Sequence, residues 1–302
     1  MDLDTQIRLA AFKWLETQSP IYEDVFPRAL LSTGFNFEGM QIPLISPQGI
    51  FRPRQLAYPI SITSAPLGPY DDSFDESGYL IYRYRGTDPS HRDNVGLRNS
   101  FFHRIPLIYF HGIIPGKYLA IWPVYIVNDN PATFSFKVAV DDKNALDQLR
   151  ESSSNKISDD SSDARRRYIT ALVKTRLHQK SFREKVLYAY RNQCAFCRLK
   201  HQELLDAAHI LPDGDPEGLP TVNNGISLCK IHHAAFDKLF IGIRPDYVIE
   251  VRDDILRESD GPMLLHGLQE LHGRTIIRPV LTKDWPDTIF LDRRYRQFKK
   301  TG

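Results

Sequence analysis

The sequence predicts a two-domain α+β protein, in which a mainly β domain of barrel type precedes a second domain built around a cluster of metal-ligand residues. Short β-rich runs separated by turn residues occur between residues 40 and 140. A Ser- and Asp-rich tract without apolar periodicity follows at 150–163, and every cysteine lies beyond it. At 302 residues the chain is long enough for two separate cores. We therefore expect a first domain at 1–149, a linker at 150–163 and a second domain at 164–302.

The first domain is expected to begin with a helix and continue as a sheet. Residues 5–18 predict an amphipathic helix, because their apolar side chains recur on one stripe. Several short strands with turn residues between them are typical of a barrel or half-barrel. The predicted strands lie in the runs MQIPLIS, PISITS, GYLIYRYRG, IPLIYFHGI, YLAIWPVYIV and FSFKVAV.

Composition narrows the class of protein. A hydrophobic content of 42% and a charged content of 25% are ordinary for a globular protein. No run of eighteen apolar residues occurs, so we expect no membrane-spanning helix. The N-terminal segment carries acids among its apolar residues and has no small-residue cleavage site, so it is not expected to be a secretory signal. Cysteines in metal-type spacing, with none left for disulfides, favour a reducing compartment and a cytoplasmic protein.

Charge is distributed in blocks around the expected linker. Residues 141–163 contain seven acids and three bases, whereas residues 164–200 contain eleven Lys or Arg and one acid. This pattern suits a spacer followed by a surface that faces a polyanion. A solvated basic helix without a partner has the same composition, and charge alone does not separate the two interpretations.

The basic block itself reads as helical over 164–192. Ser181 and Glu184 have the spacing of a capping box, which predicts a helix start at Ser181 with Phe182 and Val186 on its buried face. Near the end of the chain, the runs IGI and YVIEV predict two short strands, followed by a mixed tail with a basic end.

Two short hooks contain all three cysteines, Cys194-x2-Cys197 and Cys229-x2-His232. Zinc takes four soft or borderline ligands in a tetrahedron, and two such hooks brought together by the fold supply them. Three buried thiols clustered by chance are the alternative. The confinement of every cysteine to a hook disfavours that alternative, so the sequence predicts a structural zinc site.

Two other zinc proteins compete with this interpretation. A zinc deaminase requires His-x-Glu followed by Pro-Cys-x-x-Cys. A His-x-Glu occurs at 201–203, but the only C-x2-C precedes it and follows Gln193, so the order excludes a deaminase. A zinc module that only binds DNA stays open, although it leaves the polar residues between the hooks unexplained.

Between and beside the hooks lie residues suited to phosphodiester hydrolysis. The segment LLDAAHILP predicts a strand that presents His209, Asn224 lies in a turn, and a helix opening at Cys229 places His233 and Asp237 on one face. Hydrolysis with one divalent cation needs a neutral His to take a proton from water, ligands for the cation, and a group that orients the base.

From about Thr175 to Ile243 the chain resembles the HNH, or ββα-metal, nuclease family, through AHI, NNGISLC and HHAAFD. The resemblance implies that His209 is the general base, that Asn224 holds the His209 loop and that His233 ligates a catalytic Mg²⁺ or Mn²⁺. It further implies cleavage to a 3′-hydroxyl and a 5′-phosphate. The implied structural zinc ligands are Cys194, Cys197, Cys229 and His232. His232, rather than His233, is assigned to zinc because C-x2-H mirrors C-x2-C.

One position departs from the family pattern. Many HNH modules have an Asp directly before the catalytic His, as a metal ligand, and this chain has Ala208 there. Asp206 lies two residues earlier, on the same side of a strand, and is the expected substitute ligand; Asp237 is the alternative. An inactive HNH fold is the interpretation that competes with an active nuclease.

The stretch from 68 to 112 groups tyrosines, aspartates and arginines in the way that a pocket for an extruded base requires. Rings stack on the base, a carboxylate accepts a hydrogen bond from the cytosine amino group, and arginines hold phosphates. A Tyr-rich strand pair with a solvated acidic turn is the alternative.

Over about residues 40–130 the order of motifs resembles the SRA, or YDG, domain: Gly-Pro-Tyr-Asp-Asp, Tyr-x-Gly at 84–86, Asn99 and IPLIYFHGI. The Gly-Gly that the family has before the Tyr is absent. The resemblance implies an SRA-like barrel that flips 5-methylcytosine or 5-hydroxymethylcytosine out of the duplex. Tyr70 and Tyr84 would sandwich the base, and Asp71 or Asp72 would read its Watson–Crick edge.

Together, the two resemblances predict a modification-dependent restriction endonuclease that acts on double-stranded DNA. One HNH module cuts one strand, so a homodimer is a further hypothesis. Two alternatives stay open. One is an HNH nuclease whose β domain reads a phosphorothioate, a glucosylated base or plain sequence, and the other is a non-catalytic zinc-containing DNA-binding protein.

Overall fold

The computed structural model describes residues 2–66, 74–141 and 162–301, with only the backbone for 162–166. The chain divides into two compact units, Met1–Leu177 and His178–Gly302, and the division falls inside helix α5 (Ser162–Ala189). The expected linker lies outside the described residues up to position 161, and its last two residues begin α5.

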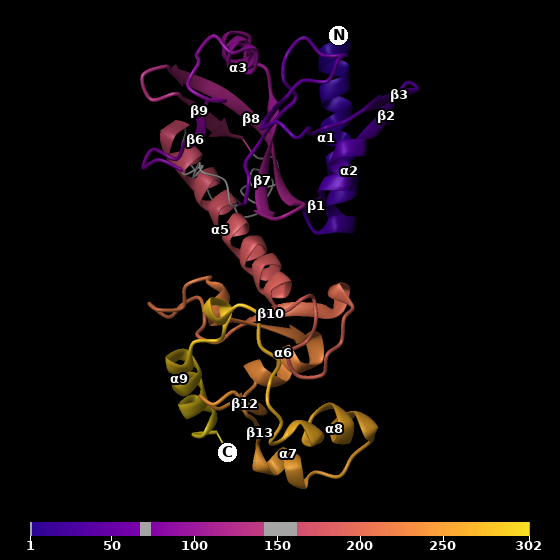
Figure 1. Cartoon of the computed structure of the whole chain (residues 1–302), viewed down its shortest axis with the longest axis vertical. Coiled ribbons are helices and arrows are strands. Elements are labelled where there is room, and N and C mark those ends of the chain that lie inside the picture. The colour runs from indigo at the N-terminus through magenta and orange to yellow at the C-terminus, as the bar shows by residue number, and fades with distance from the viewer. Residues whose placement is uncertain (1, 67–73, 142–161, 302) are drawn as a thin grey trace, which may run out of the picture. The chain divides into compact units, whose positions relative to one another are not determined.

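The first unit contains a curled, open sheet of seven strands, which confirms the expected half-barrel (Figure 1). The strand order is β4-β5-β7-β8-β9-β6, and β1 pairs with β8. All pairs are antiparallel except β5 with β7. The strands are β1 (Val25–Pro27), β4 (Ile50–Phe51), β5 (Ser61–Thr63), β6 (Leu80–Arg83), β7 (Leu107–Ile114), β8 (Lys117–Asn130) and β9 (Ser135–Val140), beside a hairpin of β2 (Phe35–Phe37) and β3 (Met40–Ile42). All six predicted runs contain a strand.

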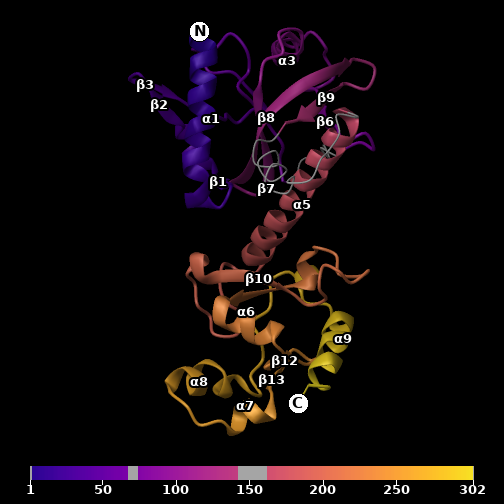
Figure 2. The same ribbon diagram turned by 180° about the vertical axis from the view of Figure 1, so that it is seen from behind.

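Helices cover both faces of this sheet. Alternate residues of a strand point to opposite sides, and both sides of this sheet carry apolar residues that need to be buried. On β8, Leu119 and Ile121 belong to one core and Ala120 to the other. The predicted N-terminal helix, α1 (Leu3–Tyr22), packs on the side of Ala120. The first half of α5 packs on the side of Leu119, where its Ile169 is buried in the same core. Figure 2 shows α1 and α5 from behind.

Two helices of the first unit were not predicted, α2 (Arg28–Thr33) and α3 (Arg92–Phe102). Helix α3 has only one buried apolar side chain, Leu97, so the sequence shows no apolar stripe there. Its anchor is polar instead. Buried Asn94 accepts a hydrogen bond from Arg85 N at 2.9 Å and donates to Asp88 O at 2.8 Å.

The second unit packs short elements around a single core. They are η1 (Gln202–Leu204), β10 (Leu205–His209), η2 (Val222–Asn224), β11 (Gly225–Cys229), α6 (Lys230–Asp237), β12 (Ile241–Ile243), β13 (Ile249–Val251), α7 (Asp253–Arg257), α8 (Pro262–Gly267), η3 (Gln269–Leu271), η4 (Thr282–Asp284) and α9 (Thr288–Phe298). The predicted strands at LLDAAHILP, IGI and YVIEV and the predicted helix after Cys229 are confirmed.

The predicted helix start at Ser181 is wrong, because Ser181 lies inside the continuous, 28-residue helix α5. Apolar residues with helical spacing extend upstream of Ser181 as Ile169, Val173 and Leu177, and they are buried in the first unit. Their burial stabilises the preceding turns, so the helix does not begin at the capping-box residues. Glu184 pairs with Arg183 at 2.9 Å instead of capping a helix. No described helix, α5 included, is long and apolar enough to cross a membrane.

Candidate active site and metal cluster

The antiparallel hairpin of β10 and β11 positions both groups of predicted site residues. Its register runs from Leu205 opposite Cys229 to His209 opposite Gly225. Gly225 is required at its position, because a Cβ there would lie 2.4 Å from Val186 Cγ2 on α5. The first hook attaches to the same hairpin through a 2.7 Å hydrogen bond from Ala195 N to Ser227 O.

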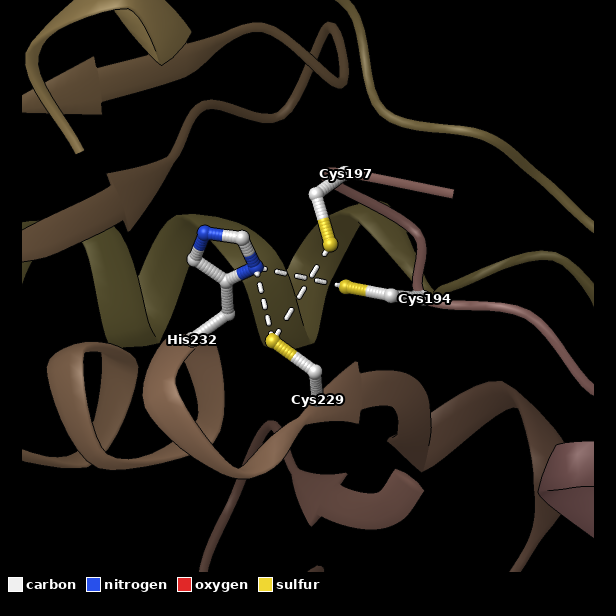
Figure 3. Close-up of side chains that lie close together, drawn as sticks. All are labelled: Cys194, Cys197, Cys229 and His232. Atoms are coloured by element: carbon white, nitrogen blue, oxygen red, sulfur yellow. Dashed lines mark hydrogen bonds between the residues drawn. The ribbon is translucent and has the colours of Figure 1, made fainter. Parts of the chain in front are cut away.

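The structure brings the four residues of the hooks together (Figure 3). One ligand atom from each of Cys194, Cys197, Cys229 and His232 lies within 4.8 Å of all the others. His232 Nδ1 is 3.4 Å from Cys194 Sγ and 3.2 Å from Cys229 Sγ, and the sulfurs of Cys197 and Cys229 are 4.0 Å apart. The edges of a tetrahedron with Zn–S bonds of about 2.3 Å are roughly 3.8 Å long. In the described part of the chain, this is the one group of His, Cys and acidic residues that converges in this way.

The orientation of His232 suits a metal ligand. Its Nε2 lies 2.7 Å from Gly267 O, and a carbonyl oxygen can only accept, so Nε2 carries the proton. The Nδ1 lone pair is then directed at the sulfurs, as in metal sites whose histidine is held by a carbonyl on its far nitrogen. Hydrogen bonds from Cys194 and Cys197 lower the pKa of the Cys229 thiol, which favours the thiolate. This Cys3His donor set could bind zinc.

His209 ends β10, and its ring is packed rather than hydrogen-bonded. The ring stacks on Phe182 of α5 with 3.9 Å between centroids and 15° between planes. Its Nε2 is buried and has no hydrogen-bond partner among the residues that the structure describes, and Asp213 Oδ1 lies 3.7 Å away. The side chain keeps 26% of its surface exposed, so part of the ring is accessible to water. Burial lowers the pKa of His209 from its ordinary value of 6.5, so the ring is neutral at neutral pH.

Asn224 is fully buried and holds the chain beyond His209. Its Oδ1 accepts from Leu211 N at 2.9 Å, and its Nδ2 donates to Leu211 O at 3.1 Å and to Leu219 O at 3.0 Å. These bonds tie both ends of the segment that follows β10 to the start of β11.

His233 lies between two carboxylates. Its Nδ1 is 3.4 Å from Asp206 Oδ2, and its Nε2 is 3.3 Å from Asp237 Oδ2. The hydrogen bond with Asp206 raises the pKa of His233. The two ring nitrogens point in opposite directions, so one ion bound to this ring can share it with one carboxylate but not with both.

The two carboxylates differ in their surroundings. Asp206 Oδ1 accepts from Ala207 N at 3.0 Å and lies 3.7 Å from Arg183 Nε. Asp237 also influences His209, because its negative charge raises the pKa of that ring against the larger, opposite effect of burial.

The predicted base pocket of the first unit requires a correction at Tyr84. This side chain is only 2% exposed, and its ring lies 4.6 Å from that of Phe136 in the core. Its hydroxyl donates to Asp129 and accepts from Arg98 at 3.2 Å. A ring packed in this way has no free face on which a base could stack. Tyr70, Asp71 and Asp72 lie outside the described residues.

Sequence reasoning missed three residues near the candidate site. Phe182 was predicted as an ordinary core residue, and no spacing links it to His209. Arg183 and Arg294 approach Asp206 and Asp237 at 3.7 and 3.8 Å from distant parts of the chain. The only sequence signal for them was their place in basic runs, which does not distinguish a site residue from a surface charge.

Comparisons with known proteins agree with part of this picture. Residues 194–244 match the family model described as HNH endonuclease. A solved "Modification dependent TagI restriction endonuclease" is similar at 17% identity and a TM-score of 0.30, over 80% of this chain and 81% of that chain. The "Type IV phosphorothioation-dependent restriction endonuclease ScoMcrA" is similar at 14% identity and a TM-score of 0.21, over 80% of this chain and 57% of that chain. TM-scores this low support no assignment by themselves. No curated protein sequence matches the chain.

Removal of one thiolate tests the metal cluster. We expect elemental analysis to find about one zinc per chain in the wild type, and its loss in Cys229→Ala together with a lower melting temperature, because a structural zinc contributes directly to folding. The exposed neighbour Lys230 provides the control, and Lys230→Ala should keep the zinc. Zinc retained at wild-type level in Cys229→Ala would contradict the assignment.

Proposed function

We propose that the protein is a metal-dependent DNA endonuclease that cuts DNA carrying a modified cytosine. The observation that carries the nuclease proposal is the arrangement of His209. This neutral histidine is fixed against Phe182 and lies within the electrostatic reach of His233 and Asp237, in a segment that matches the HNH endonuclease family model.

In the proposed reaction, His209 is the general base. Its neutral imidazole takes a proton from the attacking water, and the lowered pKa keeps the ring neutral at neutral pH. The Phe182 ring holds the imidazole plane, and Asn224 holds the backbone two residues further along. Both contacts act before substrate arrives, so the base does not need to be reoriented during the reaction. The products are a 3′-hydroxyl and a 5′-phosphate, as the family resemblance implies.

A divalent ion, Mg²⁺ or Mn²⁺, fits the donors around His233. Imidazole and carboxylate groups are ligands for such ions, and His233 with one of the two neighbouring carboxylates would hold it. When bound, the ion would stabilise negative charge on the scissile phosphate and the leaving oxygen. Asp237 is the stronger candidate for the shared carboxylate, because it lies four residues from His233 on the same helix and is the more exposed of the two acids, 53% against 43%, whereas Asp206 also accepts a hydrogen bond from Ala207 N.

The zinc ion is proposed as scaffold. Cys229 ends β11 and is the N-cap of α6, so a zinc ion there would fix the helix that carries His233 to the hairpin that carries His209. All three cysteines are free, which is consistent with the expected cytoplasmic location.

The first unit is proposed to read 5-methylcytosine or 5-hydroxymethylcytosine by base flipping. This proposal is supported by the SRA-like order of motifs in the sequence, with Tyr70 as the stacking ring and Asp71 or Asp72 as the reader of the base edge. Tyr84 is no longer included, because its ring is buried. A homodimer is proposed for double-strand cleavage, since one HNH site cuts one strand. Sedimentation of a strictly monomeric protein on cleavable DNA would contradict the dimer.

Cleavage of matched substrates separates the proposed function from its alternatives. With Mn²⁺ or Mg²⁺, the wild type should cut 5-methylcytosine or 5-hydroxymethylcytosine DNA in preference to unmodified DNA, and His209→Ala should be slower by about 10²- to 10⁴-fold. His201→Ala, at an exposed histidine of the same unit, is the matched control and should cut normally. Equal cutting of modified and unmodified DNA would exclude recognition of a modified base by the first unit. Cutting of phosphorothioate DNA alone would favour recognition of that modification instead. No cutting of any substrate would exclude the nuclease activity.

The pH dependence of cutting tests the role of the neutral imidazole. Because burial lowers the pKa of His209, the base is active above that pKa, and the rate should fall on the acid side with a midpoint below 6.5. Single-turnover rates at saturating Mn²⁺ between about pH 5 and 8, near the ordinary His pKa, measure this. A rate that rises as the pH falls would contradict a neutral general base.

A further inference from the structure

Helix α9 lies outside the segment that matches the HNH family model, yet it brings Arg294 against the candidate site. One terminal nitrogen of Arg294 is 3.8 Å from Asp237 Oδ1 and donates to Phe236 O at 3.2 Å. The guanidinium also lies over the Phe236 ring, 5.0 Å from its centroid. These contacts attach Arg294 to the C-terminal end of α6, the helix of His233.

Asp237 connects Arg294 to His233. One carboxylate oxygen of Asp237 faces Arg294, and the other lies 3.3 Å from His233 Nε2. The Asp237 side chain is 53% exposed, so neighbouring packing alone does not restrict its rotamers. The charge of Arg294 on one oxygen favours the rotamer in which the other oxygen faces His233.

The burial of Arg294 requires a compensating charge. The side chain is only 13% exposed, and its Nε is buried with no hydrogen-bond partner in the described part of the chain. A buried guanidinium costs free energy unless an acid pairs with it. In the described part of the chain Asp237 is the acid within ion-pair distance, so the position of Arg294 is explained by Asp237 better than by packing.

Helix α9 is held firmly enough to orient this arginine. Arg293 pairs with Asp215 at 2.7 Å and with Glu217, both in the loop that follows β10. Asp287 N, at the start of the helix, donates to Asn223 O at 2.9 Å, next to Asn224. At the other end, Phe298 fills the space beside Gly242, where a Cβ would lie 2.6 Å from its ring. The helix therefore contacts the segments around His209, Asn224 and His233.

From this geometry we infer that Arg294 is a positioning residue of the nuclease site, which holds Asp237 in place to share a divalent ion with His233. The inference rests on the proposed function for the identity of the site. It also gives the C-terminal helix a role in the chemistry, because the arginine that faces Asp237 Oδ1 comes from α9, outside the HNH segment.

Manganese binding to the full-length, zinc-loaded protein tests the inference without relying on cleavage. Arg294→Met keeps the apolar stem and removes the charge, and it should raise the Mn²⁺ dissociation constant, measured by electron paramagnetic resonance, by about tenfold or more. Arg296→Met is the matched control, because Arg296 lies on the same helix, is 75% exposed and, among the described residues, pairs only with Asp292 at 2.7 Å. It should bind Mn²⁺ as the wild type does.

A double variant shows whether Arg294 acts through Asp237. Arg294→Met combined with Asp237→Asn should bind Mn²⁺ no more weakly than Asp237→Asn alone, since the two side chains form one interaction. Single-turnover cleavage rates on the preferred substrate should follow the same order. If Arg294→Met does not fold, Arg294→Lys replaces it. Lysine keeps the charge but loses the planar guanidinium group, so this variant should weaken Mn²⁺ binding by a smaller factor.

A structural role would give a different result. In that case Arg294→Met lowers the melting temperature while Mn²⁺ affinity stays at the wild-type value, and the inference is overturned. Additive losses in the double variant also overturn it. Wild-type protein that binds Mn²⁺ but cuts no DNA refutes the proposed function and leaves the Mn²⁺ comparison to decide the role of Arg294.

Discussion

The antiparallel register of β10 and β11 is the constraint on which the rest of the second unit depends. Cys229 lies at one end of this five-residue pairing and His209 at the other. Side chains alternate across a strand, so a slip of one residue would turn His209 to the opposite face and move Cys229 away from the other sulfurs. The metal cluster and the candidate base are therefore specified by the same backbone hydrogen bonds. The helix α5 residues Phe182 and Val186 fix that hairpin further, because they occupy the space left open by Gly225.

Two histidines on adjoining elements are driven in opposite directions by their surroundings. Burial against Phe182 lowers the pKa of His209, and the hydrogen bond with Asp206 raises that of His233. Groups of one chemical type whose environments separate their pKa values commonly take different roles in a reaction. Here the separation suits His209 as a neutral base. It places His233 between carboxylates that favour a positive charge at that position. Without a bound ion, a proton on His233 meets the negative charge of its two carboxylates.

Much of this site could be predicted because its determinants are local. The two hooks, the strand ending in His209 and the helix after Cys229 each depend on spacings of a few residues. The failures involve contacts between distant segments. Tyr84 has the place of a pocket residue in the motif order, but its burial depends on Phe136 and Asp129, which are far along the chain. Ser181 has the pattern of a helix start, but packing of the preceding turns against the sheet extends the helix through it. Helix α3 lacks an apolar stripe and is anchored by Asn94, a type of contact that periodicity does not reveal.

The central claim is that the second unit hydrolyses DNA by direct attack of a water molecule that His209 activates. Cleavage in water enriched in ¹⁸O, followed by mass spectrometry of the product ends, tests it most directly. The account predicts 3′-hydroxyl ends and 5′-phosphates that carry one ¹⁸O from solvent after a single turnover, and formation of this product by His209→Ala about 10²- to 10⁴-fold more slowly. Product ends with a 3′-phosphate, or 5′-phosphates without ¹⁸O, would contradict it.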